Sequence, residues 1–369
     1  MTHQLHAQGA DQGITLKVYR GDRSALLAFD LDQHLARNLA GFAVQVTDPK
    51  GNALYLPNRL SYAQGLHADS KPEDHKLTPS NLAPFQRFRW FHAPEVVMPG
   101  AYQYTATAMY LKPGQDAPEP GPSATVELEI VPPPSNFQLG FTRGDLSSQG
   151  YVDKWCEDAS FAPTPKTLDY DYSKYEDKYV WLGFHARTMM MDFVDACLND
   201  PRSTLDIFAY DIDEPRIVRQ LQAMKGRLRA VLDNAPLHTK PGAMEIEVLK
   251  RLKTSAGDAN VVTGHFKRFA HDKILIRKVD GKPHSVLTGS ANFSLRGLYV
   301  QANSVIRIED PDVAGKYETA FETAFSNMHG FSKTPLAEQW FDFEKPGLPR
   351  FGVAFSPHTK GEISLDRVK

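Results

Sequence analysis

Residues 14–131 alternate between apolar and polar positions with a period of two, which is the pattern of strands that bury one face. Pro/Gly-rich turns separate the runs, and no stretch of this region has the spacing of an amphipathic helix. We therefore expect about seven short strands. The clearest runs are Ile14–Tyr19, Ala25–Phe29, Phe42–Val46, Phe85–Phe91, Tyr102–Ala108 and Val126–Ile130.

This set of strands predicts an all-β sandwich over residues 1–131, with the shape of an immunoglobulin or fibronectin domain. The chain lacks a Cys-Trp-Cys framework, so the prediction concerns shape alone. Such a sandwich could bind a partner or a surface. A rigid appendage of the rest of the chain is an equally good interpretation.

After residue 179 the period changes, and helical spacing alternates with short apolar runs. This alternation predicts a layered α/β domain with a mixed sheet. Asp213 is the expected N-cap of the helix that begins at Pro215. The predicted helices are Thr188–Leu198, Pro215–Met224, Met244–Leu252 and Val313–Met328, and the predicted strands are Leu205–Tyr210, Leu228–Leu232, Val261–Phe266 and Val305–Ile308.

The Pro-rich residues 132–136 form a stiff, extended linker between the two regions. The α/β domain is assigned to residues 137–345, and residues 346–369 form a separate tail. Residues 136–180 are irregular and rich in Asp, Tyr and Ser. They could cover a site or simply cross the surface.

The composition fits this organisation. A chain of 369 residues with 41% hydrophobic residues is long enough for two domains with their own cores. No apolar run approaches the roughly 18 residues that span a bilayer. The N-terminus has no secretory pattern, and Cys156 and Cys197 give no disulfide framework. We therefore expect a reducing, cytoplasmic location.

The candidate chemistry lies in the stretch that follows the strand at residues 261–266. His271-Asp272-Lys273 leads into an apolar run, a turn at Asp280–Pro283, a second apolar run and the sequence Gly-Ser-Ala-Asn. Side chains alternate along a strand, so His271 and Lys273 should project from one face. An imidazole can attack phosphorus or carry a proton, while Lys and Asn can hold phosphate oxygens. The segment therefore predicts a phosphodiester site.

The chain has four H-x-K triplets, but only the one at His271 precedes an apolar strand, a turn and G-S-x-N. This compound pattern, with the strand-helix-strand before it, resembles the phospholipase D superfamily over residues 179–330. The resemblance implies a hydrolase of phosphodiesterase type that works through a phosphohistidine and needs no metal or cofactor. It implies catalytic roles for His271, Lys273, Ser290 and Asn292 and supporting roles for Gly289, Ser294, Gln301 and Asn303.

Two positions depart from the family pattern. Lys278 stands where the family often has Asp, and Asn303, with Gln301 nearby, stands where it often has Glu or Gln. The family also joins two H-x-K motifs at one site, and this chain has one such motif. Completion would therefore need a homodimer or a second phospholipase D-like half. His185 or His265 would be the first sources of an acid within the chain.

A weak internal similarity favours the second half. Phe351–Lys369 and Tyr179–Val194 each have an apolar run ending in Phe, a His within three residues, a polar turn and a helical start. We interpret residues 346–369 as the start of a second half. A simple C-terminal strand and helix is the alternative.

The substrate class stays open at this point. Between Arg216 and Lys278 there are fourteen Lys/Arg against five Asp/Glu. A basic face favours nucleic acid, although anionic lipid headgroups are also attracted to one. About half of these cations could be the solvated faces of two helices. Three hypotheses follow: a nuclease, a phospholipase D that acts on phospholipid, and a binding or regulatory protein with a relic site.

The sequence contains no carboxylate/His cluster at metal-ligand spacing, so we expect no metal site.

Overall fold

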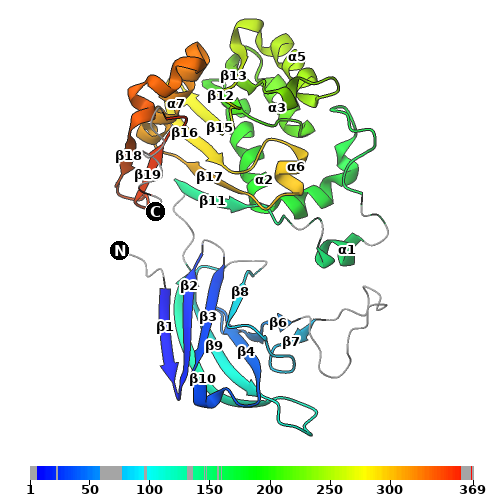
Figure 1. Ribbon diagram of the computed structural model, residues 1–369, viewed down its shortest axis with the longest axis vertical. Helices are drawn as coiled ribbons and strands as arrows, with labels where there is room; N and C mark the ends of the chain where they lie inside the picture. Colours follow the sequence, from blue (N-terminus) through cyan, green and yellow to red (C-terminus); the bar gives the residue numbers. More distant parts are fainter. Residues whose placement is uncertain are drawn as a thin grey trace. The chain divides into compact units, whose positions relative to one another are not determined.

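The computed structural model describes residues 6–21, 24–58, 77–94, 98–130, 136–144, 146, 148–155, 158, 160–358 and 367. The chain divides into two compact units, Met1–Pro133 and Pro134–Lys369, which Figure 1 shows in blue to cyan and in green to red. Each unit has its own hydrophobic clusters and is described by itself. No described helix is long and apolar enough to cross a membrane.

Unit 1 consists of antiparallel sheets. One has the strand order β1-β2-β3-β8 and the other the order β10-β9-β4-β5, and a short pair, β6-β7, accompanies them. The strands are β1 (His6–Asp11), β2 (Ile14–Arg20), β3 (Ala25–Leu31), β4 (Leu39–Thr47), β5 (Ala53–Tyr55), β6 (Pro57–Asn58), β7 (Thr78–Pro79), β8 (Arg89–His92), β9 (Gly100–Tyr110) and β10 (Glu119–Ile130).

Both four-stranded sheets contribute to one buried cluster. Leu16, Val18 and Leu27 of the first sheet and Val44 and Tyr104 of the second are in it, all almost completely buried. The strand-rich, antiparallel nature of this region is thus as predicted. The immunoglobulin or fibronectin type remains a prediction. β1 was not expected, because its polar sequence HAQGAD carries no apolar alternation.

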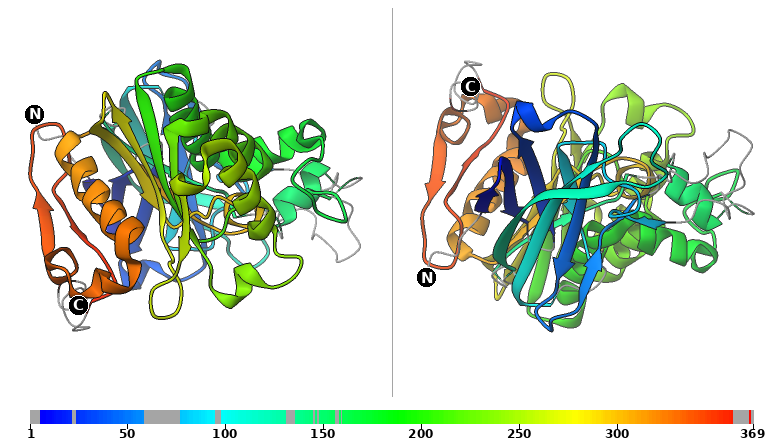
Figure 2. Two further views of the ribbon diagram at one scale, coloured as in Figure 1. Left: turned by 90° about the horizontal axis from the view of Figure 1, so that it is seen from above. Right: turned by 90° about the horizontal axis from the view of Figure 1, so that it is seen from below.

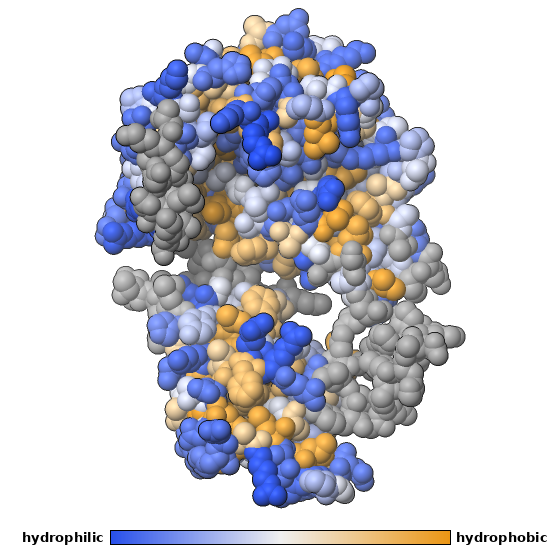
Figure 3. All heavy atoms as spheres, viewed as in Figure 1, coloured by the Kyte–Doolittle hydropathy of each residue, from blue (hydrophilic) through white to orange (hydrophobic). Residues whose placement is uncertain are grey.

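The outer face of the β1-β2-β3-β8 sheet carries an apolar row. Tyr19 pairs with Leu26 across β2 and β3, and Leu26 pairs with Phe91 across β3 and β8. These side chains are 42%, 41% and 57% exposed, respectively. Figure 3 shows apolar residues gathered on this face of unit 1.

Unit 2 is built on a seven-stranded sheet with the order β11-β17-β16-β15-β12-β13-β14. β12, β13 and β14 run parallel, and the other pairs are antiparallel, so the sheet is mixed as predicted. The strands are β11 (Phe137–Phe141), β12 (Ser203–Ala209), β13 (Leu228–Asp233), β14 (Val261–Gly264), β15 (Lys273–Val279), β16 (Lys282–Gly289) and β17 (Ser304–Ile308). A separate pair, β18 (Trp340–Phe343) and β19 (Phe351–Ala354), follows.

Helices cover both faces of this sheet. Leu275 and Leu287 pack in the cluster that α2, α3 and α5 join, whereas Ile274 and Ile276 pack in the cluster of α7. Figure 2 (left) shows α7 in orange and the green helices on opposite sides of the sheet. The helices are α1 (Gln149–Trp155), α2 (Glu176–Asn199), α3 (Pro215–Met224), α4 (Pro236–Thr239), α5 (Met244–Ala256), α6 (Leu295–Tyr299) and α7 (Pro311–Asn327).

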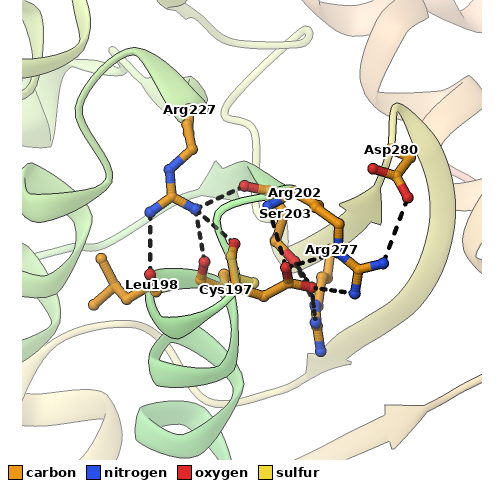
Figure 4. Close-up of polar contacts among 8 residues, drawn as sticks. Cys197, Leu198, Arg202, Ser203, Arg227, Arg277 and Asp280 are labelled. Atoms are coloured by element: carbon orange, nitrogen blue, oxygen red, sulfur yellow. Dashed lines mark hydrogen bonds and ion pairs between the residues drawn. The ribbon is translucent and has the colours of Figure 1, made fainter.

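The C-terminus of α2 is fastened to the sheet by one guanidinium group. Nη1 of Arg227 donates to the carbonyl oxygens of Cys197, Asp200 and Ser203 at 2.8, 3.0 and 2.9 Å, and Nη2 donates to that of Leu198 at 3.1 Å (Figure 4). Carbonyls at a helix end otherwise lack partners, and a cation there also complements the helix dipole. Arg227 therefore fixes where β12 begins.

The β15–β16 hairpin has a tighter turn than expected. Asp280 and Gly281 have φ values of 50° and 75°, which is the geometry of a two-residue type I′ turn. Pro283, which we had placed in the turn, lies in β16 opposite Lys278. A register shift next to Lys278 accommodates it.

Two local predictions need correction. Phe137–Phe141, expected to be irregular, is an edge strand paired with β17. The N-cap of α3 is Glu214, whose side chain accepts the Ile217 N–H at 2.7 Å. The carboxylate of Asp213 instead accepts the Leu295 N–H at 2.9 Å, which draws α6 towards the start of α3.

The similarity between the tail and Tyr179–Val194 is not a structural one. Tyr179–Val194 lies entirely within α2, interrupted only by non-helical angles at Phe184. Phe351–Ala354 is a strand paired with β18. The helical start expected after it falls on residues 359–366, outside the described residues. The second-half interpretation therefore stays a prediction, without support from the structure.

Candidate active site

The candidate site lies where β12 ends and β15 begins. Tyr210 directly follows β12, and its N–H donates to the Asp272 carbonyl at 3.0 Å. The His271 ring packs edge-on against the Tyr210 ring at 4.5 Å between centroids. The Lys273 Nζ lies 5.0 Å from the same centroid. One aromatic ring thus brings both residues of the motif together.

Lys273 is buried, and its ammonium donates to the His271 carbonyl at 2.8 Å. Burial disfavours the charged form and lowers the pKa of Lys273 to about 8, although the nearby carboxylates of Asp272, Asp211 and Asp233 act in the opposite direction. Such an ammonium is fixed in place and only partly solvated. Both properties strengthen its attraction for a phosphate oxygen.

His271 is exposed to solvent. It precedes β15, whose first residue is Lys273, so strand alternation alone does not set its direction. The rings of Tyr210 and Phe269, at 4.5 and 5.5 Å, hold the imidazole instead. Partial burial and the Lys273 charge lower the pKa of His271. A neutral, accessible imidazole is the form that can act as a nucleophile.

Asn292 reaches the same corner from the loop after β16. It is buried, and its Nδ2 lies 3.5 Å from Oδ2 of Asp211, the residue after Tyr210. The Ser294 hydroxyl donates to the same Oδ2 at 2.8 Å and accepts the Gly297 N–H, which caps α6. His271 and Lys273 on Tyr210, and Asn292 and Ser294 on Asp211, therefore converge on two consecutive residues.

Ser290 and Gly289 join β16 to β17. The Ser290 hydroxyl accepts the Ser304 N–H at 3.0 Å, and the Ser290 N–H donates to the Ser304 carbonyl at 2.9 Å. A Cβ on Gly289 would come within 2.2 Å of the Ser304 oxygen. Only glycine permits this approach. Both residues therefore shape the loop that carries Asn292.

The two supporting positions further along have structural contacts. The Asn303 Nδ2 donates to the Gly297 carbonyl at 2.8 Å, and its backbone is bonded to Thr142 after β11. The Gln301 carbonyl accepts the Thr142 hydroxyl at 2.7 Å. The Gln301 side chain is exposed and lies within 3.3 Å of the Asn303 amide. Both residues brace the loop beneath α6.

Lys278 stands where the superfamily often has Asp. Its side chain forms ion pairs on the side of the sheet that α7 covers. Its Nζ lies 2.7 Å from Asp206 and 3.5 Å from Glu318 of α7. Asp206 is 1% exposed and also pairs with Arg229, which in turn pairs with Glu322. This network belongs to the α7 side, away from His271.

Sequence reasoning missed a group of carboxylates beside the site. Asp211, His238 and Glu245 place their ligand atoms within 4.8 Å of one another. His238, which belongs to another of the four H-x-K triplets, is buried, with 4% of its surface exposed. Its ring packs against Tyr210 at 4.5 Å, on the same residue that His271 contacts. The expectation that the chain has no carboxylate/His cluster at metal-ligand spacing was wrong.

The electrostatics of this group are unusual. Burial and a hydrogen bond with Asp211 raise the pKa of Glu245 to about 7. Burial lowers the pKa of His238, but its hydrogen bond to Asp233 and the charge of Glu245 outweigh burial and raise it. Two carboxylates that crowd each other favour either a shared proton or a cation between them.

The two histidines suggested as sources of a second acid lie elsewhere. The His265 Nδ1 lies 2.6 Å from Oδ1 of Asn234, after β13. His185 lies within α2, stacked on Phe184 at 3.7 Å. Within the described chain, His238 is the histidine that shares a ring contact with His271 through Tyr210.

Comparison with known proteins identifies the fold around this site. Residues 194–325 match the family described as cardiolipin synthase, PLD-like domain. That range contains β12–β17 together with His271, Lys273 and the G-S-x-N loop. Unit 2 belongs to the phospholipase D superfamily. The match does not include unit 1.

Individual proteins are also similar to this chain. A protein of Rickettsia bellii named phospholipase D is 29% identical over 186 residues, which cover 49% of this chain and 87% of that protein. Two solved structures are similar at lower identity. They are the phospholipase D family member Nuc from Salmonella typhimurium (20% identity, 38% of this chain, 88% of that chain, TM-score 0.31) and NucT from Helicobacter pylori (14%, 39%, 91%, 0.31).

Proposed function

We propose that this protein is a phospholipase D-type phosphodiesterase that hydrolyses nucleic acid through a phosphohistidine at His271. The observation that carries the proposal is the convergence of His271, Lys273 and Asn292 at the Tyr210–Asp211 corner. The nucleophile is exposed, whereas the two groups assigned to the phosphate oxygens are buried and fixed. Preorganised donors of this kind stabilise charge that develops in the transition state.

In the proposed first step an imidazole nitrogen of His271 forms a bond to phosphorus as the bond to the leaving oxygen breaks. Lys273 and Asn292 hold the non-bridging oxygens, and an acid protonates the leaving oxygen. In the second step water attacks phosphorus, and the bond between phosphorus and His271 breaks. The group that acted as the acid in the first step now accepts the proton of the water. No metal or cofactor takes part.

The acid must lie across phosphorus from His271. We propose that it comes from a second copy of this site, either in a two-fold homodimer or in a second phospholipase D-like half. Light scattering combined with an activity assay at the same concentration tests this. A dimer that loses activity as it dissociates supports the proposal, and a fully active monomer refutes it.

A nucleic-acid substrate is favoured by cations beside the site. Lys267 and Arg268 are exposed in the loop just before His271, and Lys240 is exposed close to His238. Exposed cations near a phosphodiester site attract a polyanion over several residues. Many of the other cations of this basic region are engaged in ion pairs or carbonyl contacts within unit 2, namely Arg216, Arg227, Arg229, Arg251, Arg277 and Lys278.

The test is hydrolysis of three substrates in EDTA: plasmid DNA, RNA and phosphatidylcholine vesicles. We expect cleavage of nucleic acid that survives the chelator and is lost in the folded variant His271→Ala. Cleavage of the vesicles alone would favour the alternative, a phospholipase D acting on phospholipid. If no substrate is cleaved, the third hypothesis remains: a binding or regulatory protein with a relic or incomplete site, motivated by Lys278 and Asn303.

A further inference from the structure

Asp211, His238 and Glu245 come from three different elements. Asp211 follows β12, His238 lies in α4, and Glu245 is in the first turn of α5. One oxygen or nitrogen from each lies within 4.8 Å of the other two. Asp211 and Glu245 are partly accessible to solvent, whereas His238 is buried. These are the donor types and the convergence that a metal ion requires.

A second carboxylate orients the histidine. Oδ2 of Asp233 lies 2.7 Å from Nδ1 of His238, and Asp233 is itself held by the backbone N–H groups of Ala235 and Ala270. With Nδ1 engaged, Nε2 is the nitrogen left to face Asp211 and Glu245. Histidines that bind metals almost always donate their other N–H to a carboxylate or carbonyl in this way.

Among the described residues, no lysine or arginine forms an ion pair with Asp211 or Glu245. A second carboxylate group in the same unit shows the contrast. Asp206, Glu318 and Glu322 are equally close together, but Lys278 and Arg229 are paired with them. The carboxylates of Asp211 and Glu245 are therefore not held by ion pairs with lysine or arginine, unlike those of the second group.

The side-chain amide of Asn292 lies beside the cluster. Asn292 is 9% exposed, its Nδ2 lies 3.5 Å from Asp211, and its Oδ1 is buried without a hydrogen-bond partner among the described residues. A buried amide oxygen without a partner is costly. The Asn292 side chain is thus a polar group with an unused oxygen next to Asp211.

We propose that Asp211, His238 through Nε2, and Glu245 bind a divalent transition-metal ion, with Asp233 as the residue that orients His238. An imidazole with two carboxylates suits Mn²⁺ or Zn²⁺, whereas Mg²⁺ and Ca²⁺ prefer oxygen ligands alone. The ion takes no part in the attack by His271. It offsets the carboxylate charge of Asp211 and Glu245.

The test is isothermal titration of the metal-stripped full-length protein with MnCl₂, ZnCl₂ and MgCl₂ separately. We expect one tight Mn²⁺ or Zn²⁺ per chain and much weaker Mg²⁺ binding. Glu245→Gln should lower the affinity at least about tenfold, and Asp233→Asn, which only frees the imidazole, roughly 10–100-fold. Glu322→Gln, in the paired cluster, is the matched control and should bind like the wild type.

This inference goes beyond the proposed function and can fail separately. His271→Ala should lose turnover yet bind the ion unchanged, so metal binding is measured without activity. Absence of binding by the folded wild-type protein would overturn the metal site, as would equal binding by Glu245→Gln. Loss of kcat in EDTA, restored by Mn²⁺, would instead contradict the metal-free hydrolysis and leave the metal site standing.

Discussion

The most informative single change is to give Lys278 the residue that the superfamily often has there. Lys278 is 8% exposed, and its ammonium lies 2.7 Å from the buried Asp206 and 3.5 Å from Glu318. In Lys278→Asp this cation is replaced by a carboxylate, which would face the carboxylates of Asp206 and Glu318. The family residue should therefore be strongly destabilising in this chain, although no contact of the candidate site is altered.

The size of the effect follows from two estimates. Removal of one partner from a buried ion pair costs about 3–5 kcal/mol. A new like charge about 4 Å from Asp206 costs about 4 kcal/mol at an effective dielectric constant of 20. Arg229 still pairs with Asp206 and relieves part of this. We expect a net loss of about 4 kcal/mol, or a fall in the melting temperature of roughly 8–16 °C for a unit of this size.

The stability of unit 2 can be measured by tryptophan fluorescence during thermal and urea unfolding. Three of the four tryptophans, Trp155, Trp181 and Trp340, belong to unit 2, and Trp90 belongs to unit 1. Lys278→Met removes the cation without a new charge and should cost about 3 kcal/mol, at the lower end of the range for a buried pair, because Arg229 still pairs with Asp206. Lys282→Asp, on the exposed end of the same hairpin, should change stability by less than about 0.5 kcal/mol. A Lys278→Asp protein as stable as the wild type would refute the role given to this network.

Three further outcomes concern the candidate site. Tyr210→Leu should lower kcat about 10–100-fold because the ring that holds His271 and Lys273 is lost, whereas Tyr210→Phe should stay near wild type; equal kcat in both variants would exclude this role. The pH–rate profile should rise as His271 loses its proton below pH 6.5 and fall near pH 8 as Lys273 becomes neutral; a rate still rising at pH 9 would contradict the Lys273 assignment. Gly297→Ala should lower both stability and activity, because its Cβ would meet the Asn292 backbone oxygen at 2.6 Å; crystallography of the variant would show the shift of the Asn292 loop.

Much of unit 2 was predictable because its elements are amphipathic and well punctuated. The helix Pro215–Met224 has its predicted bounds, with Pro215 at its first position, and β13 and β17 lie within a residue of prediction at each end. β11 was missed because an edge strand with four of its five residues only partly buried or exposed gives no alternation. The kink of α2 at Phe184 was missed, although Gly183 directly before it was a signal that could have found it.

The linear motif could be read from sequence, but the residues around it could not. His271, Lys273 and Asn292 stand in a recognisable order, whereas Asp211 and His238 are far apart in the sequence and come together only in the folded chain. One signal was available. Asp211 follows β12 and Asp233 ends β13, and the carboxyl ends of neighbouring parallel strands lie at one edge of a sheet.

The contacts of Lys278 and Asn303 also bear on whether these two departures from the family pattern indicate a relic site. Lys278 pairs with Asp206 on the α7 side, and Asn303 donates to the carbonyl of Gly297, which packs against the Asn292 loop. Each is engaged where it stands, and neither leaves a partner group unsatisfied. A site under decay would be expected to lose its reactive groups first, yet His271, Lys273 and Asn292 are present and converge. The two departures are therefore better explained as local structural substitutions than as signs of a relic site, and the case for a relic has to come from assays of turnover.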